Sequence, residues 1–234
     1  MKAVVLAGGK GTRLAPYTTI LPKPLLPIDD TPILDVIIRQ LVRNGFDDIT
    51  LAVGHLAELI MAYCGDGAKY KVKLAYSREH KPLGTAGPLA TIPGLSGTFL
   101  VINGDVLTTL DYGDMWRYHE DQGAIATLAV CKKDIRLELG VVESDGQRIK
   151  KYVEKPTLCY SVSAGIYVFE PGVLKYITPG EYLDLPQLVM SLIRDEQRVA
   201  CYTFDGYWLH IGRQDDYKIA IQEYSAHRGE FLPQ

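Results

Sequence analysis

A short apolar run at the start of the chain, Lys2–Leu6, leads directly into a glycine-rich loop, Gly8–Arg13. Glycine tolerates positive φ and lets backbone N–H groups approach an anion closely. An apolar strand that ends in such a loop is typical of α/β folds, which bind phosphates at the carboxyl edge of a parallel sheet. The sequence therefore predicts a buried first strand followed by a phosphate-binding loop.

Two familiar phosphate-binding loops do not match this stretch. A Walker A loop places four residues between its first glycine and Gly-Lys-Ser/Thr, and that spacing is absent. A dinucleotide fingerprint, GxGxxG, would need a third glycine where this chain has Leu14 after Gly9 and Gly11. We therefore expect neither a P-loop NTPase nor a nicotinamide-dependent dehydrogenase.

Apolar strand patterns alternate with amphipathic helical patterns through the first half of the chain. The clearest helix is expected to begin with Thr31 as its N-cap and Pro32 in its first turn, and to stop at Gly45. This rhythm predicts an α/β fold with a Rossmann-like, doubly wound, mixed but mostly parallel sheet in an α/β/α sandwich. The expected strands are Lys2–Leu6, Ile49–Val53, Val72–Tyr76 and Thr98–Ile102, with further helices through residues 56–63 and at Thr85–Thr91.

The second half of the chain has more strands and fewer helices. This change of character predicts a mixed sheet with an inserted two-stranded ribbon. No repeat or linker interrupts the chain, so we expect one domain over residues 1–234. The expected strands are Ala124–Val130, Gly140–Glu143, Arg148–Glu154 and Val162–Phe169, and the expected helices are Asp184–Arg194 and Gln214–His227.

The composition argues against several classes of protein. The net charge is −3, so the chain offers no broad surface for nucleic acid or membranes. No apolar run reaches transmembrane length, and the first residues run straight into a strand rather than a signal peptide. The four cysteines form no CxxC pair, which favours reduced thiols buried as small hydrophobes. These features predict a cytoplasmic protein.

A lysine, Lys23, stands between Pro22 and Pro24 shortly after the glycine loop. Proline fixes its own φ and restricts the residue before it, so this lysine lies on a stiff backbone. The run GGKGTRLAPYTTILPKPLLPI, residues 8–28, resembles the N-terminal signature of the sugar-1-phosphate nucleotidyltransferases, GGxGTRLxPxT followed by PKPLxPI. The resemblance continues in family order over nearly the whole chain, through Pro32–Leu34, Leu83–Leu89, Asn103–Asp105, Gly140–Val142, Glu154–Pro156 and Ala164–Phe169.

Members of this family transfer a nucleotidyl group from an NTP to a sugar 1-phosphate and release pyrophosphate. The resemblance implies that Arg13 holds the departing pyrophosphate, since its forked guanidinium matches phosphate geometry. It implies that Lys23 places a charge on the α-phosphate or the incoming phosphate. The residues implied to bind the nucleotide are Leu6, Ala7, Gly8, Gly9, Gly11, Thr12, Gly84, Thr85 and Gly104.

The expected strand Thr98–Ile102 ends in Asn103-Gly104-Asp105 at the ligand-binding edge of the sheet. A carboxylate there suits Mg²⁺, or Mn²⁺, bridging phosphate oxygens. Relatives have an aspartate as second metal ligand where this chain has His210, so three alternatives stay open. His210 ligates the metal through nitrogen, or it contacts a phosphate and leaves Asp105 as the main ligand, or the site is impaired.

The resemblance also implies a sugar pocket formed by Gly140, Glu154, Lys155, Ser163 and Gly165, with Ala164 beside them. Glu154 is implied to bond the sugar hydroxyls and Lys155 the sugar phosphate. Many relatives have asparagine at the position of Ser163, so the hydroxyl contacts there are expected to differ.

The run Leu83–Leu89, LGTAGPL, resembles mannose-1-phosphate guanylyltransferases and related enzymes that act on heptose or amino-sugar 1-phosphates. GTP is therefore the expected donor, and a nucleotide sugar for polysaccharide assembly the expected product. The alternatives are a uridylyl- or thymidylyltransferase of the same family and a catalytically silent regulatory homologue. Because many relatives are dimers or tetramers, a homo-oligomer is expected.

Overall fold

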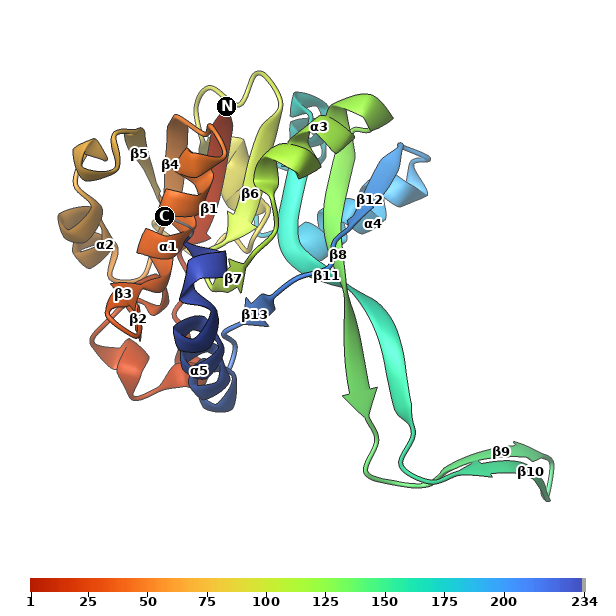
Figure 1. Ribbon diagram of the computed structural model, residues 1–234. Coiled ribbons are helices and arrows are strands. Elements are labelled where there is room, and N and C mark those ends of the chain that lie inside the picture. Colours follow the sequence, from red (N-terminus) through yellow and green to blue (C-terminus); the bar gives the residue numbers. More distant parts are fainter. Residues whose placement is uncertain (233–234) are drawn as a thin grey trace.

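The computed structural model describes residues 1–232 and is built around a seven-stranded sheet. Its strands are β1 Lys2–Ala7, β4 Asp48–Val53, β5 Lys73–Arg78, β6 Phe99–Asn103, β8 Ala126–Arg136, β11 Thr157–Phe169 and β12 Val199–Thr203. Their order across the sheet is β12-β8-β11-β6-β1-β4-β5. All neighbours are parallel except that β11 runs antiparallel to β6 and β8 (Figure 1). The mixed, mostly parallel sheet confirms the predicted fold class.

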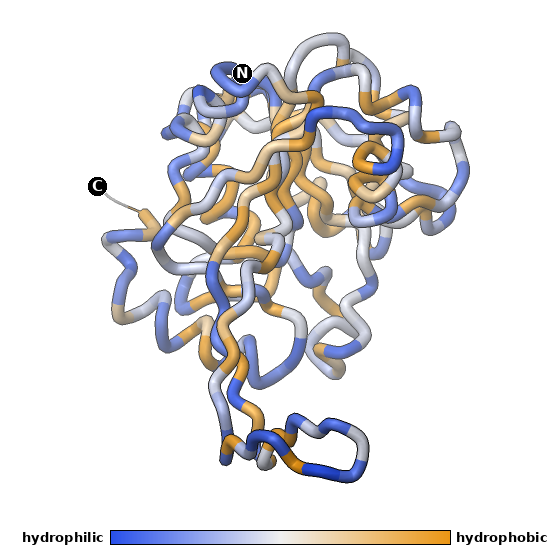
Figure 2. The backbone as a smooth tube through the Cα atoms, turned by 90° about the vertical axis from the view of Figure 1, so that its right-hand side faces the viewer, coloured by the Kyte–Doolittle hydropathy of each residue, from blue (hydrophilic) through white to orange (hydrophobic). Residues whose placement is uncertain are grey.

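Helices cover both faces of this sheet: α1 Ile33–Arg43, α2 Ala57–Cys64, α3 Tyr112–Gln122, α4 Leu185–Arg194 and α5 Gln214–Phe231. Successive residues of a strand point to opposite faces. Ala3 and Val5 of β1 accordingly pack in one core with α1, α2, α3 and α5, and Val4 packs in a second core with α4. Hydrophobic stretches concentrate in the strands between these layers (Figure 2). None of the helices within residues 1–232 has the length and apolarity needed to cross a bilayer.

Three small two-stranded sheets accompany the main one. They are β2 Pro27–Ile28 with β3 Thr31–Pro32, β7 Val106–Thr108 with β13 Trp208–His210, and β9 Val141–Asp145 with β10 Arg148–Val153. The β7–β13 pair joins segments about a hundred residues apart in the chain and sets His210 opposite Val106. His210 is thereby held next to Asp105, the residue before Val106.

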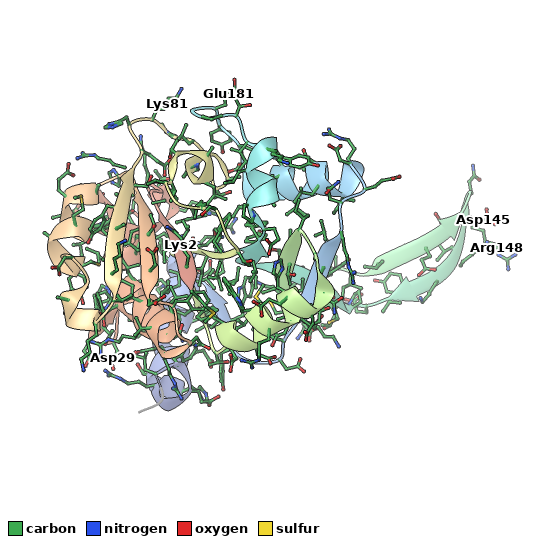
Figure 3. All side chains as sticks on the ribbon, turned by 90° about the horizontal axis from the view of Figure 1, so that it is seen from above. Lys2, Asp29, Lys81, Asp145, Arg148 and Glu181 are labelled. Atoms are coloured by element: carbon green, nitrogen blue, oxygen red, sulfur yellow. The ribbon has the colours of Figure 1, made fainter. Side chains whose placement is uncertain are left out.

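A long arm leaves the sheet where β8 ends and β11 begins (Figure 1). We define the arm as residues 132–161. Its first part continues the β8–β11 pairing, from Ser161 opposite Lys132 to Thr157 opposite Arg136, and its outer part is the β9–β10 ribbon. Figure 3 shows the tip, with Asp145 and Arg148, far from the body. The predicted inserted ribbon is confirmed, but β8 and β11 reach well beyond the expected limits at Val130 and Val162.

Two expected helix starts are wrong. Thr31 is not an N-cap: Thr31–Pro32 pairs with Pro27–Ile28 as β3, and α1 begins at Ile33 after Pro32. The predicted helix Thr85–Thr91 is only a 3-10 turn over Gly87–Thr91, because Ala86 and Gly87 donate their backbone N–H groups to the Leu183 carbonyl instead. In the first case pairing with the neighbouring strand, and in the second case hydrogen bonds to a distant segment, replaced the helix that the local sequence predicted.

The short strands β2, β3, β7 and β13 were not expected from the sequence, and neither were two longer elements, α3 and β12. The helix α3 reads YGDMWRYHEDQ, with a glycine inside it and only a thin apolar stripe. Its signals are at its ends, where the Asp111 side chain accepts from the Asp114 N–H and Gly123 takes a left-handed conformation. The strand β12 lies at the sheet edge with two of its five residues exposed and none fully buried, so it lacks the continuous apolar run typical of a buried parallel strand.

The expectation that every cysteine is a small buried hydrophobe holds for two of the four. Cys64 and Cys131 are buried, whereas Cys159 and Cys201 are exposed. Cys159 lies on the arm and Cys201 on the edge strand β12.

Candidate active site

The glycine loop follows β1 at the carboxyl edge of the sheet, in the middle of the strand order. Gly11 has φ +61°, and its carbonyl accepts from the Leu14 N–H and the Thr18 hydroxyl, each at 2.8 Å. Within the described residues, the backbone N–H groups of Gly9, Lys10 and Gly11 donate no hydrogen bond. Unused donors on a curved, exposed loop are the arrangement that binds phosphate oxygens.

Close packing at the base of the loop explains one glycine outside it. The Gly104 N–H donates to the Leu6 carbonyl at 2.9 Å. A Cβ on Gly104 would meet that carbonyl oxygen at 2.7 Å, so only glycine lets the segment after β6 lie against the end of β1. Gly8 is crowded in the same way by Glu79, whose Oε1 would lie 2.4 Å from a Cβ. The predicted nucleotide residues Leu6, Ala7, Gly8, Gly9, Gly11, Thr12 and Gly104 thus lie around one bend of the chain.

Lys23 points into the same edge of the sheet. It lies in a 3-10 turn, Lys23–Leu25, preceded by Pro22 in an extended conformation. Its ammonium forms an ion pair with Asp105, and 11% of the Lys23 side chain and 21% of the Asp105 side chain are exposed. The stiff backbone between the two prolines therefore holds a largely buried charge directly over the end of β6.

Asp105 and His210 meet through the β7–β13 pair, with His210 Nε2 3.5 Å from Asp105 Oδ2. Burial acts to raise the pKa of Asp105, but the imidazole of His210 and the charge of Lys23 outweigh it and hold this pKa below its ordinary value. The carboxylate is therefore ionised. Its Oδ1 is buried without a hydrogen-bond partner, as is Oδ1 of Asn103. A buried oxygen left unpaired in this way is expected to have a ligand.

Asp105 and His210 offer the side-chain ligands for a divalent cation at this edge of the sheet. Within residues 1–232, no group of three or more His, Cys, Asp or Glu side chains is arranged to hold a metal ion. The free Oδ1 of Asp105 is a suitable ligand, and His210 adds a nitrogen beside it. Mg²⁺ is commonly bound by one or two carboxylates, with water and substrate phosphates completing its octahedron. Asp105 fits that pattern, and His210 adds a softer nitrogen ligand beside it.

Arg13 lies in the 3-10 turn Thr12–Leu14 that follows the loop and is exposed. It forms no hydrogen bond or ion pair with any residue in the described part of the chain. An arginine that is fixed at its backbone, free at its guanidinium and next to unused N–H donors is placed to bind an anion.

Glu79 is a carboxylate beside the glycine loop that the sequence did not single out. It directly follows β5, its Oε1 lies against Gly8, and its Oε2 accepts from the Leu83 N–H at 3.1 Å. Burial raises its pKa, and the Leu83 hydrogen bond partly offsets this effect. The only signal in the sequence is its position at the end of an expected strand, which many surface carboxylates share.

The segment 83–88 is tied to the start of α4. Asp184 Oδ1 accepts from the Thr85 N–H and hydroxyl, and the Thr85 hydroxyl accepts from the Leu185 N–H. Gly84 has φ +77° and would place a Cβ 2.4 Å from the Leu183 carbonyl oxygen. The polar groups of Thr85 are therefore used within the protein, and the residue positions this segment beside Glu79.

The order of these groups along the sheet edge follows the strand order. Asp105 follows β6, the glycine loop follows β1, and Glu79 follows β5, three strands from β6. Strands are about 4.8 Å apart, so this row spans about 14 Å. That span suits an extended nucleotide with its phosphates at the loop and its base near Glu79.

The predicted sugar residues divide into two groups. Ser163 and Gly165 lie on β11 at the base of the arm, beside β6. Ser163 Oγ is 3.1 Å from the Tyr167 hydroxyl, and Gly165, at φ +74°, packs against Asn103. Gly140, Glu154 and Lys155 lie on the arm. In this structure the arm carries these three residues away from Asp105 (Figure 1).

The arm holds its own three residues together. The Tyr152 hydroxyl donates to Glu154 at 2.7 Å and lies 2.1 Å from where a Cβ on Gly140 would stand. Lys155 has φ +45°, and its ammonium is 3.6 Å from Glu138 Oε2. The structure therefore separates the predicted sugar pocket into one part on the body and one part on the arm.

Comparison with known proteins identifies the family. The sequence profile described as "Nucleotidyl transferase" matches residues 2–227, and the chain belongs to this family. The chain is 38% identical to a UTP–glucose-1-phosphate uridylyltransferase of Synechocystis sp., over 95% of this chain and 63% of that protein. It is 34% identical to mannose-1-phosphate guanylyltransferase catalytic subunit beta of Danio rerio, over 96% of this chain and 64% of that protein.

The fold is also shared with solved structures. A putative glucose-1-phosphate thymidylyltransferase from Bacillus anthracis superposes with a TM-score of 0.78 at 23% identity, over 95% of this chain and 94% of that chain. This likeness concerns the fold alone. The chain spans slightly less than two thirds of the length of the two curated relatives named above.

Proposed function

We propose that this protein transfers a nucleoside monophosphate from an NTP to a sugar 1-phosphate and releases pyrophosphate. The observation that carries the proposal is the meeting of three features at one sheet edge. They are a loop with unused N–H donors, an unpartnered arginine, Arg13, and a buried Lys23–Asp105 pair with a free carboxylate oxygen. Together they supply what a reaction between two phosphate anions needs.

In the proposed reaction, an oxygen of the sugar phosphate attacks the α-phosphorus of the NTP in line with the leaving group. A new P–O bond forms as the bond to the β-phosphate oxygen breaks, and its electron pair leaves with the pyrophosphate. Both phosphates are already ionised, so no general base is required. The task of the protein is to position the two anions and to stabilise the charge that develops.

The position of each residue indicates its role in the proposed reaction. The N–H groups of Gly9, Lys10 and Gly11 hold the triphosphate, and Arg13 binds the β- and γ-phosphates as they depart. Lys23 lies next to Asp105 and directs its charge to the α-phosphate. Asp105 and His210 would hold Mg²⁺ or Mn²⁺, which supplies a Lewis acid for the phosphate oxygens.

Glu79 supports GTP as the donor. The pairing edge of guanine carries two adjacent donors, N1–H and N2–H₂, and a carboxylate can accept both hydrogen bonds. Uracil and thymine present one N3–H between two carbonyl oxygens, which a carboxylate would repel. The curated relatives include a uridylyltransferase and a guanylyltransferase, so Glu79 is the feature of this chain that favours guanine.

Replacing Glu79 by glutamine is expected to shift the choice of base. The amide offers one acceptor and one donor, which matches N3–H and a carbonyl oxygen of a pyrimidine. A hydrogen bond to a charged group is worth about 1.5–3 kcal/mol, so kcat/KM for GTP should fall about 10- to 100-fold while UTP or dTTP gains. Steady-state kinetics with each NTP measures the ratio of kcat/KM for GTP to kcat/KM for UTP or dTTP.

The matched control for this prediction is Glu58→Gln. Glu58 lies on α2 in an ion pair with Arg78 and is exposed. The control should leave the ratio of kcat/KM for GTP to kcat/KM for UTP unchanged. If Glu79→Gln lowers activity with every base equally, Glu79 does not select the base.

His210→Asp tests whether His210 lies at a metal site. A carboxylate beside Asp105 would bind Mg²⁺ more tightly than an imidazole, because magnesium prefers oxygen ligands. A ligand that binds the folded state raises the melting temperature by mass action. We therefore expect added Mg²⁺ to raise the melting temperature more in the variant than in the wild type, as measured by thermal denaturation.

The control for His210→Asp is His227→Asn, which changes a half-exposed histidine on α5 without adding a carboxylate beside Glu223 and Glu230. It should respond to Mg²⁺ as the wild type does. An equal response in His210→Asp would place the metal away from residue 210 and would favour the alternative in which His210 contacts a phosphate.

The proposed function itself is tested by pyrophosphate release. GTP, ATP, CTP, UTP and dTTP are crossed with glucose, mannose, glucosamine, N-acetylglucosamine and heptose 1-phosphates, with Mg²⁺ or Mn²⁺. We expect turnover with GTP and one sugar phosphate, of the mannose, heptose or amino-sugar type. A preference for UTP or dTTP would keep the reaction and overturn the choice of GTP. If the folded protein releases no pyrophosphate with any of these pairs of NTP and sugar phosphate, a regulatory homologue is favoured.

A further inference from the structure

The arm, residues 132–161, is an unusual surface for a protein without a partner. It consists of two successive two-stranded pairings, the outer part of β8 with β11 and then β9 with β10, and no helix or third strand covers them (Figures 1 and 3). An isolated two-stranded ribbon is only marginally stable in water, and its edges leave N–H and C=O groups unpaired. A ribbon of this length therefore needs a surface to pack against.

The arm also exposes a large share of apolar side chains. Leu139 is 77% exposed and Ile149 62% exposed. Large apolar residues gathered on one exposed element mark an interface rather than ordinary surface. Those exposed on the arm are Ile135, Leu139, Val142, Ile149, Tyr152, Leu158 and Tyr160.

The body has a complementary surface next to the active site. Tyr17, Ile20 and Leu21 lie between the glycine loop and Lys23 in the chain, and all three are exposed, Ile20 at 73%. The arm carries seven Lys or Arg and five Asp or Glu, a net charge of +2. The whole chain has −3, so the remaining residues carry −5. The arm and the body thus complement each other in apolar surface and in net charge.

The sugar side of the active site is open in a single copy. Ser163 and Gly165 border it from β11, while Gly140, Glu154 and Lys155 are held by contacts within the arm. Beyond a bulge between Ser163 and Tyr167, the β8–β11 pairing is continuous from Ser163 opposite Val130 to Thr157 opposite Arg136, and this ladder carries the arm outward.

We propose that the arm of one copy covers the sugar side of the active site in a second copy, and that two copies exchange arms about a two-fold axis. Glu154 and Lys155 then complete the partner copy's site, and the apolar arm residues cover Tyr17, Ile20 and Leu21. In a two-fold arrangement both sites are completed in the same way. The assignment of Glu154 and Lys155 to the sugar phosphate rests on the proposed function.

Mixed dimers test this exchange directly. One tagged chain carries Asp105→Asn, which disables its body but leaves its arm intact. The other carries Glu154→Ala with Lys155→Ala, which disables its arm but leaves its body intact. The two are expressed together and purified through both tags, so that every dimer is mixed. Each variant alone should be inactive.

If arms are exchanged, one of the two sites in each mixed dimer combines an intact body with an intact arm. The mixed dimer should then recover about half of the wild-type turnover. If each arm serves its own body, both sites carry a defect and the mixed dimer stays as inactive as the single variants. That second result would overturn the proposal.

A second measurement does not depend on activity. Light scattering during size exclusion should give a mass of twice 26.0 kDa. Leu139→Glu should raise the dimer dissociation constant at least about 10-fold, whereas Ile193→Glu, an exposed residue of α4, should not. A monomer at all concentrations, or a dimer indifferent to Leu139→Glu, would overturn the exchange even if the wild type proves inactive. A wild-type dimer that responds as expected but is inactive would instead count against the proposed function alone.

Discussion

Asp105→Asn is expected to lower turnover by about 10²- to 10³-fold, the usual cost of removing one group that stabilises transition-state charge. The substitution keeps the shape of the side chain but removes the negative charge that pairs with Lys23 and that would bind the cation. Steady-state pyrophosphate release at saturating GTP and sugar phosphate measures the loss. Because the charge matters for chemistry, kcat should fall more than KM rises.

The fold should survive this change. Asp105 does contribute to stability, since its lowered pKa reports favourable interaction with His210 and Lys23 in the folded state. Losing the partner of Lys23 should reduce the free energy of unfolding by about 1–3 kcal/mol, as measured by denaturant titration. Asp215→Asn, at a carboxylate 90% exposed on α5, is the control and should change neither quantity. Turnover of Asp105→Asn within a few-fold of the wild type would remove the carboxylate from the mechanism.

Arg13→Ala is expected to lower turnover by at least about 10³-fold, a loss typical of arginines that neutralise a leaving phosphate. The Arg13 guanidinium has no partner in the described residues, so its removal breaks no internal contact. The melting temperature should therefore stay unchanged, which separates this effect from a loss of structure. Arg13→Lys should recover only part of the activity, because an ammonium lacks the bidentate fork.

The control for Arg13 is Arg117→Ala, at an exposed arginine of α3 that pairs with Asp114. It should retain full turnover. Should Arg13→Ala instead raise only the KM for the NTP and leave kcat intact, Arg13 would bind the ground state and would not act on the leaving group.

The proposed nucleotide site has two parts, the phosphate-binding part and the part near Glu79, and only the first could be predicted from the sequence. The glycine loop, Arg13 and Lys23 lie within sixteen residues, Gly8 to Lys23, so their spacing alone points to phosphate. Glu79 has no local pattern around it. It becomes meaningful only because β5 ends two strands away from β1 and places its carboxylate against Gly8.

The pairing of His210 with Asp105 illustrates the same limit. The sequence singled out His210 through a family resemblance, and it left three alternatives for its role. The β7–β13 pair sets the imidazole 3.5 Å from the carboxylate, which a reader of the sequence could not obtain from two residues about a hundred positions apart. The response of His210→Asp to Mg²⁺ distinguishes a metal ligand at this position from a phosphate contact.

By itself, the sequence determined the α/β class, the parallel strands of the first half, the main helices α1, α2, α4 and α5, and the presence of an inserted ribbon. These follow from local hydrophobic period and from glycine and proline positions, which act over a few residues. The tertiary structure alone decided where the ribbon points, that Thr31–Pro32 pairs rather than caps, and that Thr85 is tied to Asp184. Those outcomes depend on contacts between segments that are far apart in the sequence. A pattern of neighbouring residues gives no information about such contacts.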